Sequence, residues 1–362
     1  MLFAENILKE LEYYTKNKII LRDNTPYYLM KGPYTFEEVQ HIQDINRIPQ
    51  KRLDFQSFFR KHQTEFNFFA DLLEDQSSRE FLKEVLLFQM LGHTKIRLRT
   101  NTEKLARTFE RVRQNKLPRI QREKVSVNHV QSLFRYRFPF MDVITHDAFF
   151  LEVIVMNQYH LQTKECNICV EKGDIVLECG SEFGDVGLLF ASRVGDDGKI
   201  FCFECSEINR RYLQLNLALN SQYKNIEVLP YAVSNKSGDF VSFSWKAGAT
   251  QIGQVEESGM QEQAETISID DFCEQKQLEQ LDFIKMDIEG AERLALEGAQ
   301  QSIRRFKPKM AIAAYHRPDD LLVLSKLILD IEPSYRFFLR HHSIHASETV
   351  IYAIPESRWK RE

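Results

Sequence analysis

Long hydrophobic runs are absent from this chain of 362 residues. No apolar stretch approaches the roughly 20 residues that a helix needs to span a bilayer. Residues 1–14 mix acidic and basic side chains into an amphipathic helical pattern, which lacks the continuous apolar segment of a signal peptide. We therefore expect a cytoplasmic protein without a membrane span. Since 43% of its residues are hydrophobic, the chain can still bury a substantial core.

Cysteine is also scarce, with six residues in the whole chain. Four of them form two C-x-x-C pairs, Cys166 with Cys169 and Cys202 with Cys205, a spacing typical of zinc sites. Cys202, however, lies in the middle of an apolar run that predicts a strand, and its recruitment as a ligand would pull that strand apart. We therefore favour buried, reduced thiols, which agrees with a cytoplasmic protein.

Recognisable nucleic-acid-binding motifs and low-complexity tracts are missing as well, and the formal net charge is −4. The charge divides unevenly, because residues 1–160 carry a net +5 and residues 161–362 a net −9. Apolar residues in the first part recur at three- and four-residue steps, which indicates helices. We predict a mostly α-helical N-terminal domain over 1–160, which recognises the substrate, forms a homodimer, or both, and an α/β domain over 161–362. We expect no nucleic-acid partner.

The densest positive charge of the first part lies between Lys95 and Lys124. The segment from Thr100 to Glu103 has the form of a helix capping box. The helix predicted after it carries Arg107 and Arg111 away from its apolar side. This face is either an ordinary solvated surface or, through Arg107 and Arg111, a binding surface for an anionic substrate.

The segment ECGSEFGD at residues 178–185 is the most informative one in the chain. Residues 175–177 predict a short buried strand that stops at Glu178, and Gly180 and Gly184 then allow a tight turn into a helix. A second apolar run at 200–203 closes at Glu204. Such a strand, helix and strand form a nucleotide site in which the second acid accepts hydrogen bonds from ribose hydroxyls.

This turn lacks the dinucleotide fingerprint G-x-G-x-x-G, because Ser181 and Glu182 follow Gly180. A pyrophosphate there would meet the negative charges of Glu178, Glu182 and Asp185. A cationic or zwitterionic ligand fits better, and S-adenosylmethionine, with its sulfonium, ammonium and ribose groups, is the common one. The alternative is a plain α/β turn that binds no ligand.

The segment LDFIKMDIEGAERLALEGA at residues 281–299 predicts another central strand followed by a helix. The carboxyl ends of parallel strands meet at one edge of a sheet, so we expect Asp287 and Glu289 to face the same crevice as Glu178 and Glu204. Lys285 lies two residues before Asp287 on the same side of the strand. It either neutralises its acidic neighbours or takes part in catalysis, and we favour the first role.

Four segments together resemble the FkbM family of S-adenosylmethionine-dependent methyltransferases: ECGSEFGD, FECSEINRRYLQLNLALN, LPYAVSNKSG and FIKMDIEGAERLALEGA. The resemblance covers about residues 170–354. It implies an α/β fold with a Rossmann-like sheet of seven strands, the last antiparallel, and helices on both faces. It also implies roles for individual residues: Glu178 near the methionine amino group, Gly180 and Gly184 under the cofactor, Glu204 on the ribose, and Ala232, Val233 and Asn235 by the adenine.

Two positions depart from the family pattern. The family commonly has Ala-Asn after the first glycine of the loop, where this chain has Ser181-Glu182, and proline after the ribose acid, where this chain has Cys205. The first change alters the hydrogen bonding of the loop, and the second alters how the loop is stiffened. Ser181 and Cys205 remain candidates for contact with the cofactor.

Histidine is absent between residues 161 and 315, whereas four of the ten histidines follow. His316 comes directly after a predicted strand, and an imidazole titrates near neutral pH. We therefore predict that His316 removes the proton of the acceptor hydroxyl and that Asp287 orients the acceptor or the cofactor. His341 and His342, which end the next predicted strand, join Glu289 as substrate-binding candidates. A divalent metal held by Asp287, Glu289 and a histidine is an alternative that we do not favour.

These observations predict an S-adenosylmethionine-dependent O-methyltransferase that acts on a hydroxyl group of a sugar, a surface glycan or a related metabolite. Two alternatives remain open. One is methylation of a nitrogen on a lipid-linked or peptide substrate, which uses the same cofactor site. The other is a catalytically silent scaffold whose basic helical domain binds a partner, although Glu178, Gly180 and Glu204 argue against it.

Overall fold

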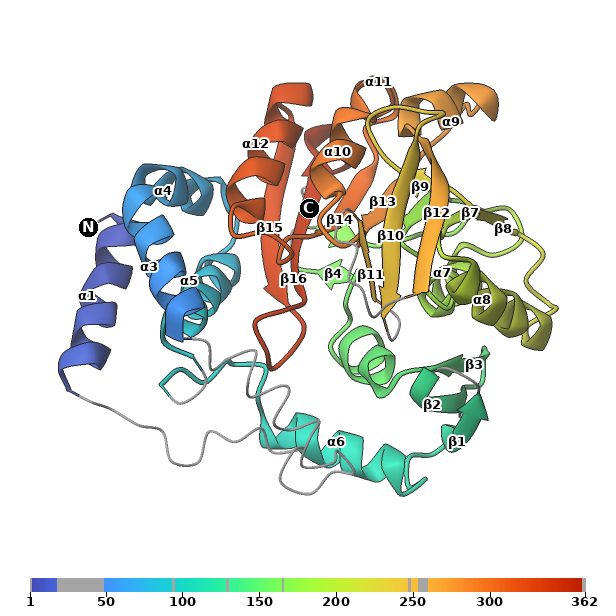
Figure 1. Ribbon diagram of the computed structural model, residues 1–362, viewed down its shortest axis with the longest axis horizontal. Helices are drawn as coiled ribbons and strands as arrows, with labels where there is room; N and C mark the ends of the chain where they lie inside the picture. Colours follow the sequence, from blue (N-terminus) through green and yellow to red (C-terminus); the bar gives the residue numbers. More distant parts are fainter. Residues whose placement is uncertain are drawn as a thin grey trace.

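A seven-stranded sheet forms the centre of the protein (Figure 1). The computed structural model describes residues 2–17, 49–92, 95–127, 130–164, 166–246, 249–252 and 260–359. The sheet has the order β15-β16-β14-β13-β6-β7-β8, and β16 runs antiparallel to both of its neighbours. Its strands are β6 (Ile175–Cys179), β7 (Lys199–Phe203), β8 (Ile226–Leu229), β13 (Phe283–Met286), β14 (Lys309–Ala313), β15 (Tyr335–His341) and β16 (Thr349–Pro355). The predicted α/β sheet with an antiparallel last strand is confirmed.

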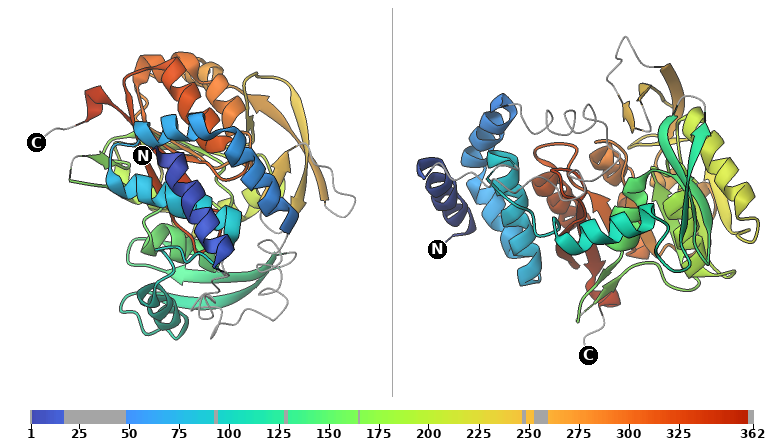
Figure 2. Two further views of the ribbon diagram at one scale, coloured as in Figure 1. Left: turned by 90° about the vertical axis from the view of Figure 1, so that its left-hand side faces the viewer. Right: turned by 90° about the horizontal axis from the view of Figure 1, so that it is seen from below.

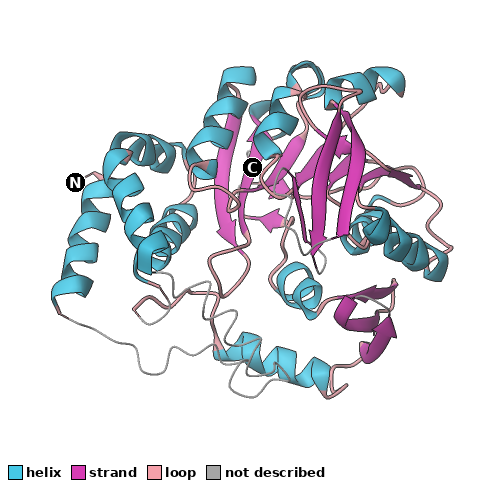
Figure 3. Cartoon of the chain, in the orientation of Figure 1, coloured by secondary structure: helices cyan, strands magenta, loops and turns pink. Residues whose placement is uncertain are grey.

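Apolar clusters cover both faces of this sheet. Leu177 belongs to one cluster and its neighbour Val176 to the other, because successive side chains of a strand point to opposite faces. The helices that follow the strands supply much of both clusters (Figure 3). They are α7 (Asp185–Val194), α8 (Glu207–Leu219), α9 (Ile269–Gln275), α10 (Glu292–Glu297), α11 (Gln300–Phe306) and α12 (Asp320–Ile331).

The register of the central strands brings three polar side chains into one row. Lys285 of β13 pairs with Glu178 of β6, which pairs with Cys202 of β7. Side chains paired in this way lie next to one another on the same face. The row therefore places an ammonium group, a carboxyl group and a thiol together below the loop that follows β6.

Helices make up most of the described N-terminal region, as predicted. They are α1 (Phe3–Lys16), α3 (Pro49–Lys61), α4 (Gln63–Leu72), α5 (Gln76–Leu91) and α6 (Glu103–Arg113). The antiparallel sheet of β1 (Gln121–Val127), β2 (Val130–Arg137) and β3 (Asp142–Thr145) was not predicted. It leads into the π-helix η1 (Phe149–Val155) and the short strands β4 (Leu161–Gln162) and β5 (Asn167–Ile168). None of the helices in the described part of the chain has the length and apolar character that a bilayer span requires.

The N-terminal helices cover the edge of the large sheet (Figure 2). The Glu74 amide donates to the Phe337 carbonyl oxygen over 3.0 Å, and the Leu339 amide donates to the Ser78 hydroxyl over 2.9 Å. Arg340 forms an ion pair of 2.6 Å with Asp75. These contacts occupy backbone groups of β15 that would otherwise form an exposed sheet edge.

The residue that caps helix α6 lies two positions after Thr100, the first residue of the predicted capping box. Thr102 is the residue that caps it, and its hydroxyl accepts from the Leu105 amide over 3.1 Å. The Thr100 hydroxyl instead donates to the Ser343 carbonyl oxygen, far away in the sequence. Thr100 therefore ties the start of α6 to the turn before β16.

A smaller sheet in the order β11-β10-β12-β9 follows β8 in the chain. Its strands are β9 (Ala232–Val233), β10 (Phe240–Lys246), β11 (Ala249–Ile252) and β12 (Met260–Ile267). Strand β9 pairs in parallel with β12 through Ala232 and Val233. This pairing holds in place the two residues that were expected beside the adenine.

Candidate active site

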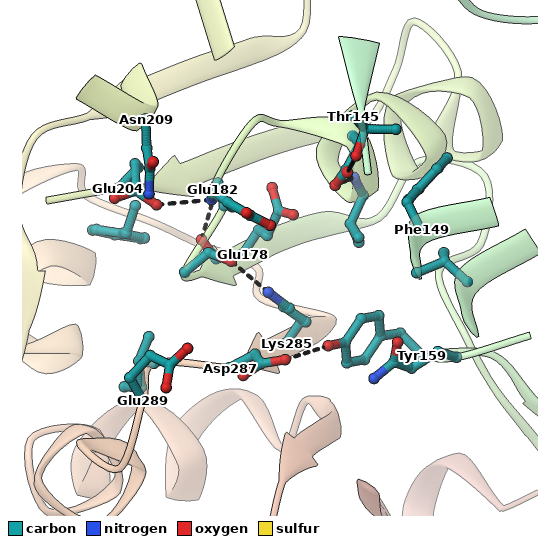
Figure 4. Close-up of a pocket in the computed structure, with 18 of the residues that line it drawn as sticks. Thr145, Phe149, Tyr159, Glu178, Glu182, Glu204, Asn209, Lys285, Asp287 and Glu289 are labelled. Carbon is teal, nitrogen blue, oxygen red and sulfur yellow. Dashed lines mark hydrogen bonds between the residues drawn. The ribbon is translucent and has the colours of Figure 1, made fainter. Parts of the chain in front are cut away.

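A cavity of about 370 Å³ opens at the carboxyl edge of the seven-stranded sheet. The ends of β6, β7 and β13 form one side, and Thr145 of β3 and Phe149 of η1 lie across from them (Figure 4). The turn before β16 adds Glu348 to the lining. Nine of the predicted catalytic, cofactor-binding and substrate-binding residues line this cavity: Glu178, Gly180, Ser181, Glu204, Cys205, Ala232, Val233, Asp287 and Glu289. The strand-end residues expected to share one crevice are therefore brought together.

The loop after β6 passes very close to β13. Gly180 has a φ of +81°, and a Cβ atom at this position would lie 1.8 Å from the carbonyl oxygen of Asp287. No other residue type fits without moving one of the two segments. The Lys285 ammonium donates a hydrogen bond to the Gly180 carbonyl oxygen and so holds the loop against β13.

Glu178 lies fully buried beneath this loop. Burial raises the pKa of its carboxyl group to about 7, although Lys285 and the Cys202 thiol, whose sulfur is 3.0 Å away, act in the opposite direction. Burial also opposes the charge of Lys285, but Asp287, Glu178 and Asp185 outweigh it and raise the pKa of the ammonium group. These contacts match the neutralising role that we favoured for Lys285.

Glu204 ends β7 with its carboxyl group already oriented. One oxygen accepts from the Glu182 amide over 2.7 Å, and the other accepts from the Ser206 amide over 2.8 Å. Burial raises the pKa of Glu204 to about 7 against these two hydrogen bonds. Glu204 therefore presents a fixed pair of acceptor oxygens at the cavity wall.

The departure at Glu182 has a structural consequence. Glu182 has a φ of +43°, in the left-handed region, which asparagine tolerates better than glutamate. Its amide is nevertheless the donor that orients Glu204. The loop therefore adopts a left-handed conformation at a residue that does not favour it, and the carboxyl group of Glu182 lines the cavity.

Asp287 accepts hydrogen bonds from two tyrosines that sequence reasoning missed. The Tyr159 hydroxyl lies 2.7 Å from Oδ2, and the Tyr315 hydroxyl lies 3.2 Å from Oδ1. Tyr315 directly precedes His316, so its place at the strand end was a usable signal. Tyr159 lies between η1 and β4, where no pattern indicated a site.

His316 contacts three carboxyl groups with a side chain that is 8% exposed. Its Nδ1 lies 3.0 Å from Glu292, and its Nε2 lies 3.4 Å from Asp287 and 3.6 Å from Glu289. Burial opposes protonation, but the three acids outweigh it and raise the pKa of His316 to about 10. In these surroundings the imidazole carries a proton at neutral pH, so it does not fit the predicted role of a resting base.

The other predicted substrate-binding residues lie elsewhere. His341 contacts the Thr349 hydroxyl, and His342 contacts the Met156 carbonyl oxygen and the Tyr352 hydroxyl, at 2.9 to 3.0 Å. Burial lowers the pKa of His341 to about 3 and of His342 to about 4, as expected for neutral histidines in a core.

Arg107 and Arg111 are exposed on α6, and Arg107 pairs with Glu103 at 2.6 Å. They form no part of the cavity lining. The substrate-binding role of the two arginines therefore stays a prediction that the cavity lining does not support, and the same holds for the two histidines.

The cavity is strongly acidic, which the sequence indicated only for the cofactor loop. Eight carboxyl groups line it: Glu152, Glu178, Glu182, Asp185, Glu204, Asp287, Glu289 and Glu348. Glu152 and Glu348 come from η1 and from the turn before β16, and no motif marked them. Glu348 has a φ of +67°, and burial together with the charge of Asp287 raises its pKa to about 7, while a hydrogen bond from Gln158 opposes the shift.

Comparison with known proteins identifies the domain that holds this cavity. Residues 178–339 match the family model of the methyltransferase FkbM domain. The chain carries an FkbM methyltransferase domain. The matched residues contain the cofactor loop, Glu204, Asp287 and His316, so the FkbM domain supplies most of the acidic cavity wall.

One solved structure agrees on the fold. The crystal structure of methyltransferase FkbM from Methylobacillus flagellatus KT is 23% identical with a TM-score of 0.51, and the match covers 84% of this chain and 62% of that protein. The chain thus spans less than two thirds of that protein's length. An O-methyltransferase from Bacillus cereus in complex with SAH is 12% identical, with a TM-score of 0.35 and coverage of 70% and 90%. No curated protein matches the chain significantly.

Proposed function

We propose that the protein is an S-adenosylmethionine-dependent methyltransferase that methylates a hydroxyl group of a sugar, a glycan or a related polyhydroxyl compound. The observation that carries this proposal is the position of Glu204 and the Gly180 loop at one wall of a cavity within an FkbM domain. The loop leaves no room for a side chain at Gly180, and Glu204 is oriented for two neighbouring hydroxyl groups. These residues fit the cofactor.

Each part of the cofactor has residues to receive it. Glu204 accepts from the ribose hydroxyls, and Ala232, Val233 and Cys205 form the wall on the adenine side. The acidic residues near the loop, Glu178 and Asp287 among them, suit the ammonium and sulfonium charges. When bound, S-adenosylmethionine supplies the methyl group as an electrophile.

The opposite half of the cavity suits an acceptor rich in hydroxyl groups. Thr145, Gln158, Tyr159 and Tyr315 offer hydrogen-bonding groups there, and Phe149 offers an apolar surface. Carboxyl groups surround the cavity, and Lys285 is the one lysine or arginine among the described residues that line it. The site therefore does not favour an anionic acceptor, and the anionic class suggested by Arg107 and Arg111 is no longer proposed. The same charge suits an amine-bearing acceptor such as an amino sugar.

Glu348 replaces His316 as our candidate for the base. It lines the cavity, its pKa of about 7 matches the ideal for a base at neutral pH, and its left-handed backbone shows the local strain that often marks functional residues. We propose that Glu348 takes the proton of the acceptor hydroxyl. Because methyl transfer depends mainly on alignment, the remaining cavity residues act by positioning the acceptor.

The experiment is methyl transfer from a methyl-labelled donor to a panel of neutral sugars, amino sugars and uronic acids, with products identified by mass spectrometry. We expect methylation of neutral or amino sugars, and a turnover of wild type that rises through about pH 7. Glu348→Gln should lower turnover by roughly 10²–10⁴-fold without loss of donor binding, whereas Glu103→Gln, an exposed control on α6, should not. Methylation confined to uronic acids would refute the proposed acceptor class. Full turnover by Glu348→Gln would refute the assignment of Glu348 as the base.

A further inference from the structure

The group around His316 has the arrangement of a cation site. An oxygen of Asp287, an oxygen of Glu292 and a ring nitrogen of His316 lie within 4.8 Å of one another. Asp287 and Glu292 lie at the two ends of the loop between β13 and α10, and His316 follows β14, so two segments far apart in the sequence converge here. Glu289 is a fourth potential ligand, because its Oε2 atom lies 3.6 Å from His316 Nε2.

An unsatisfied nitrogen points to a missing ligand. Both ring nitrogens of His316, Nδ1 and Nε2, are buried without a hydrogen-bond partner of good geometry, and the side chain is 8% exposed. The Oε2 atom of Glu292, a residue that is 1% exposed, also has no hydrogen-bond partner. Buried polar atoms of this kind are rare in folded proteins and require an explanation.

The distances fit the coordination shell of a metal ion. With donor atoms about 2.1 Å from a cation, neighbouring donors of an octahedral or tetrahedral shell lie about 3.0 to 3.5 Å apart. Nε2 of His316 is 3.4 Å from Asp287 Oδ1 and 3.6 Å from Glu289 Oε2. Both carboxylates therefore lie at the distance from Nε2 that neighbouring donors of one shell would have, and side-chain rotation of Glu289 would bring its oxygen to the ion that Asp287 and His316 hold.

Glu292 completes the pattern from the other side of the ring. Its Oε1 lies 3.0 Å from Nδ1 of His316, and it also accepts from the Ile288 amide over 2.9 Å. Metal-binding histidines almost always donate their other ring nitrogen to a carboxylate, which fixes the tautomer and the ring orientation. With Glu292 beside Nδ1, that nitrogen would keep its proton, and the ion would take the place of the Nε2 proton that His316 carries in the metal-free protein.

We propose that this site binds a divalent first-row metal ion of the Mn²⁺ type, held by His316 Nε2, Asp287 and Glu289, with Glu292 orienting the imidazole. One imidazole with several carboxylates suits Mn²⁺ better than a cation that binds oxygen alone. This inference rests on the proposed function for its role: Asp287 and Glu289 line the cavity, so the ion would hold the acceptor's hydroxyl oxygens beside the methyl donor.

The test is a titration of the chelator-treated protein with Mn²⁺, followed by the loss of the electron paramagnetic resonance signal of the free ion. We expect saturation at one ion per chain. His316→Ala and Asp287→Asn should weaken binding by at least about 100-fold, and Glu292→Gln by about 10- to 100-fold. Glu274→Gln, an exposed control on α9, should bind Mn²⁺ like wild type.

Absence of saturable Mn²⁺ binding to wild type would overturn the proposal, and so would binding that the His316 and Asp287 variants retain. Circular dichroism shows whether each variant is folded, and Glu289→Gln replaces any variant that is not. Binding of S-adenosylhomocysteine is measured separately by calorimetry. If the protein binds S-adenosylhomocysteine but no Mn²⁺, the metal site is refuted and the proposed function stands. If it binds Mn²⁺ but no S-adenosylhomocysteine, the proposed function is refuted and the metal site stands.

Discussion

Replacement of Glu204 by glutamine probes the cofactor site with almost no change in volume. In the wild type each oxygen of Glu204 accepts one backbone hydrogen bond, from Glu182 or from Ser206. The amide group of glutamine would turn an NH₂ toward one of these donors, so the variant loses both the charge and the fixed orientation. We therefore expect weaker binding of S-adenosylhomocysteine with the fold retained.

The magnitude follows from the hydrogen bonds that the carboxylate offers. A hydrogen bond to a charged group contributes roughly 1.5–3 kcal/mol, and each 1.4 kcal/mol corresponds to about a tenfold change in the dissociation constant. Loss of one such bond to the ribose predicts affinity lower by about 10- to 150-fold. Glu207→Gln, an exposed position at the start of α8, is the matched control.

The same variant has a distinct pH dependence. Because burial raises the pKa of Glu204 to about 7, the side chain is largely protonated at pH 6 and ionised at pH 8. Wild-type affinity for S-adenosylhomocysteine should therefore rise across this interval, and that of Glu204→Gln should rise less. Calorimetry at pH 6, 7 and 8 gives the comparison. Equal affinities of the two proteins at pH 8, with both folded, would refute the assignment of Glu204 to the ribose.

Three further outcomes are expected. Gly180→Ala should abolish cofactor binding in calorimetry, because the added Cβ would collide with the Asp287 carbonyl oxygen. Gly238→Ala is the control and should retain binding, since Gly238 has the same φ of +81° but open space around it. Similar binding by both variants would contradict the close approach of the Gly180 loop to Asp287. Charge reversal at Arg107 and Arg111 should leave the Michaelis constant of the acceptor unchanged, and an increase would return α6 to the substrate site. The melting temperature of the ligand-free protein should fall from about pH 5 to pH 8. The pKa of Glu178 and of Glu204 is near 4.5 in the unfolded chain and about 7 in the folded protein, so the unfolded state releases its protons first as the pH rises. A constant or rising melting temperature would contradict these pKa values.

The cofactor half of the site could be predicted from the sequence because its determinants are local. Glu178, Gly180 and Glu204 lie within one strand, turn, helix and strand, and the order of these elements alone places them at the same sheet edge. Asp287 was found for the same reason. The carboxyl end of a parallel strand is a position that the sequence defines.

The acceptor half depends on contacts between distant segments. Glu152, Tyr159 and Glu348 reach the cavity from η1, from the segment before β4 and from the turn before β16, and no spacing in the sequence connects them. The charge of His316 depends on Glu292, which lies 24 residues earlier and contacts it only in the fold. The domain boundary near residue 160 and the homodimer stay predictions.

His341 and His342 show why a strand end is not by itself a site. Both were expected at the cavity because they end a strand of the same sheet. In the structure β15 lies at the sheet edge, and the two rings turn into the packing around β16 and η1. Position along the strand was predictable, but the direction of the side chains was not.

The most direct test of the account is a calorimetric competition between two ligands on the purified wild-type protein. Saturable binding of S-adenosylhomocysteine with one site per chain, without measurable binding of NAD, is the result that the acidic loop and Glu204 predict. Binding of NAD without a response to S-adenosylhomocysteine would contradict the central claim that this cavity holds a methyl donor.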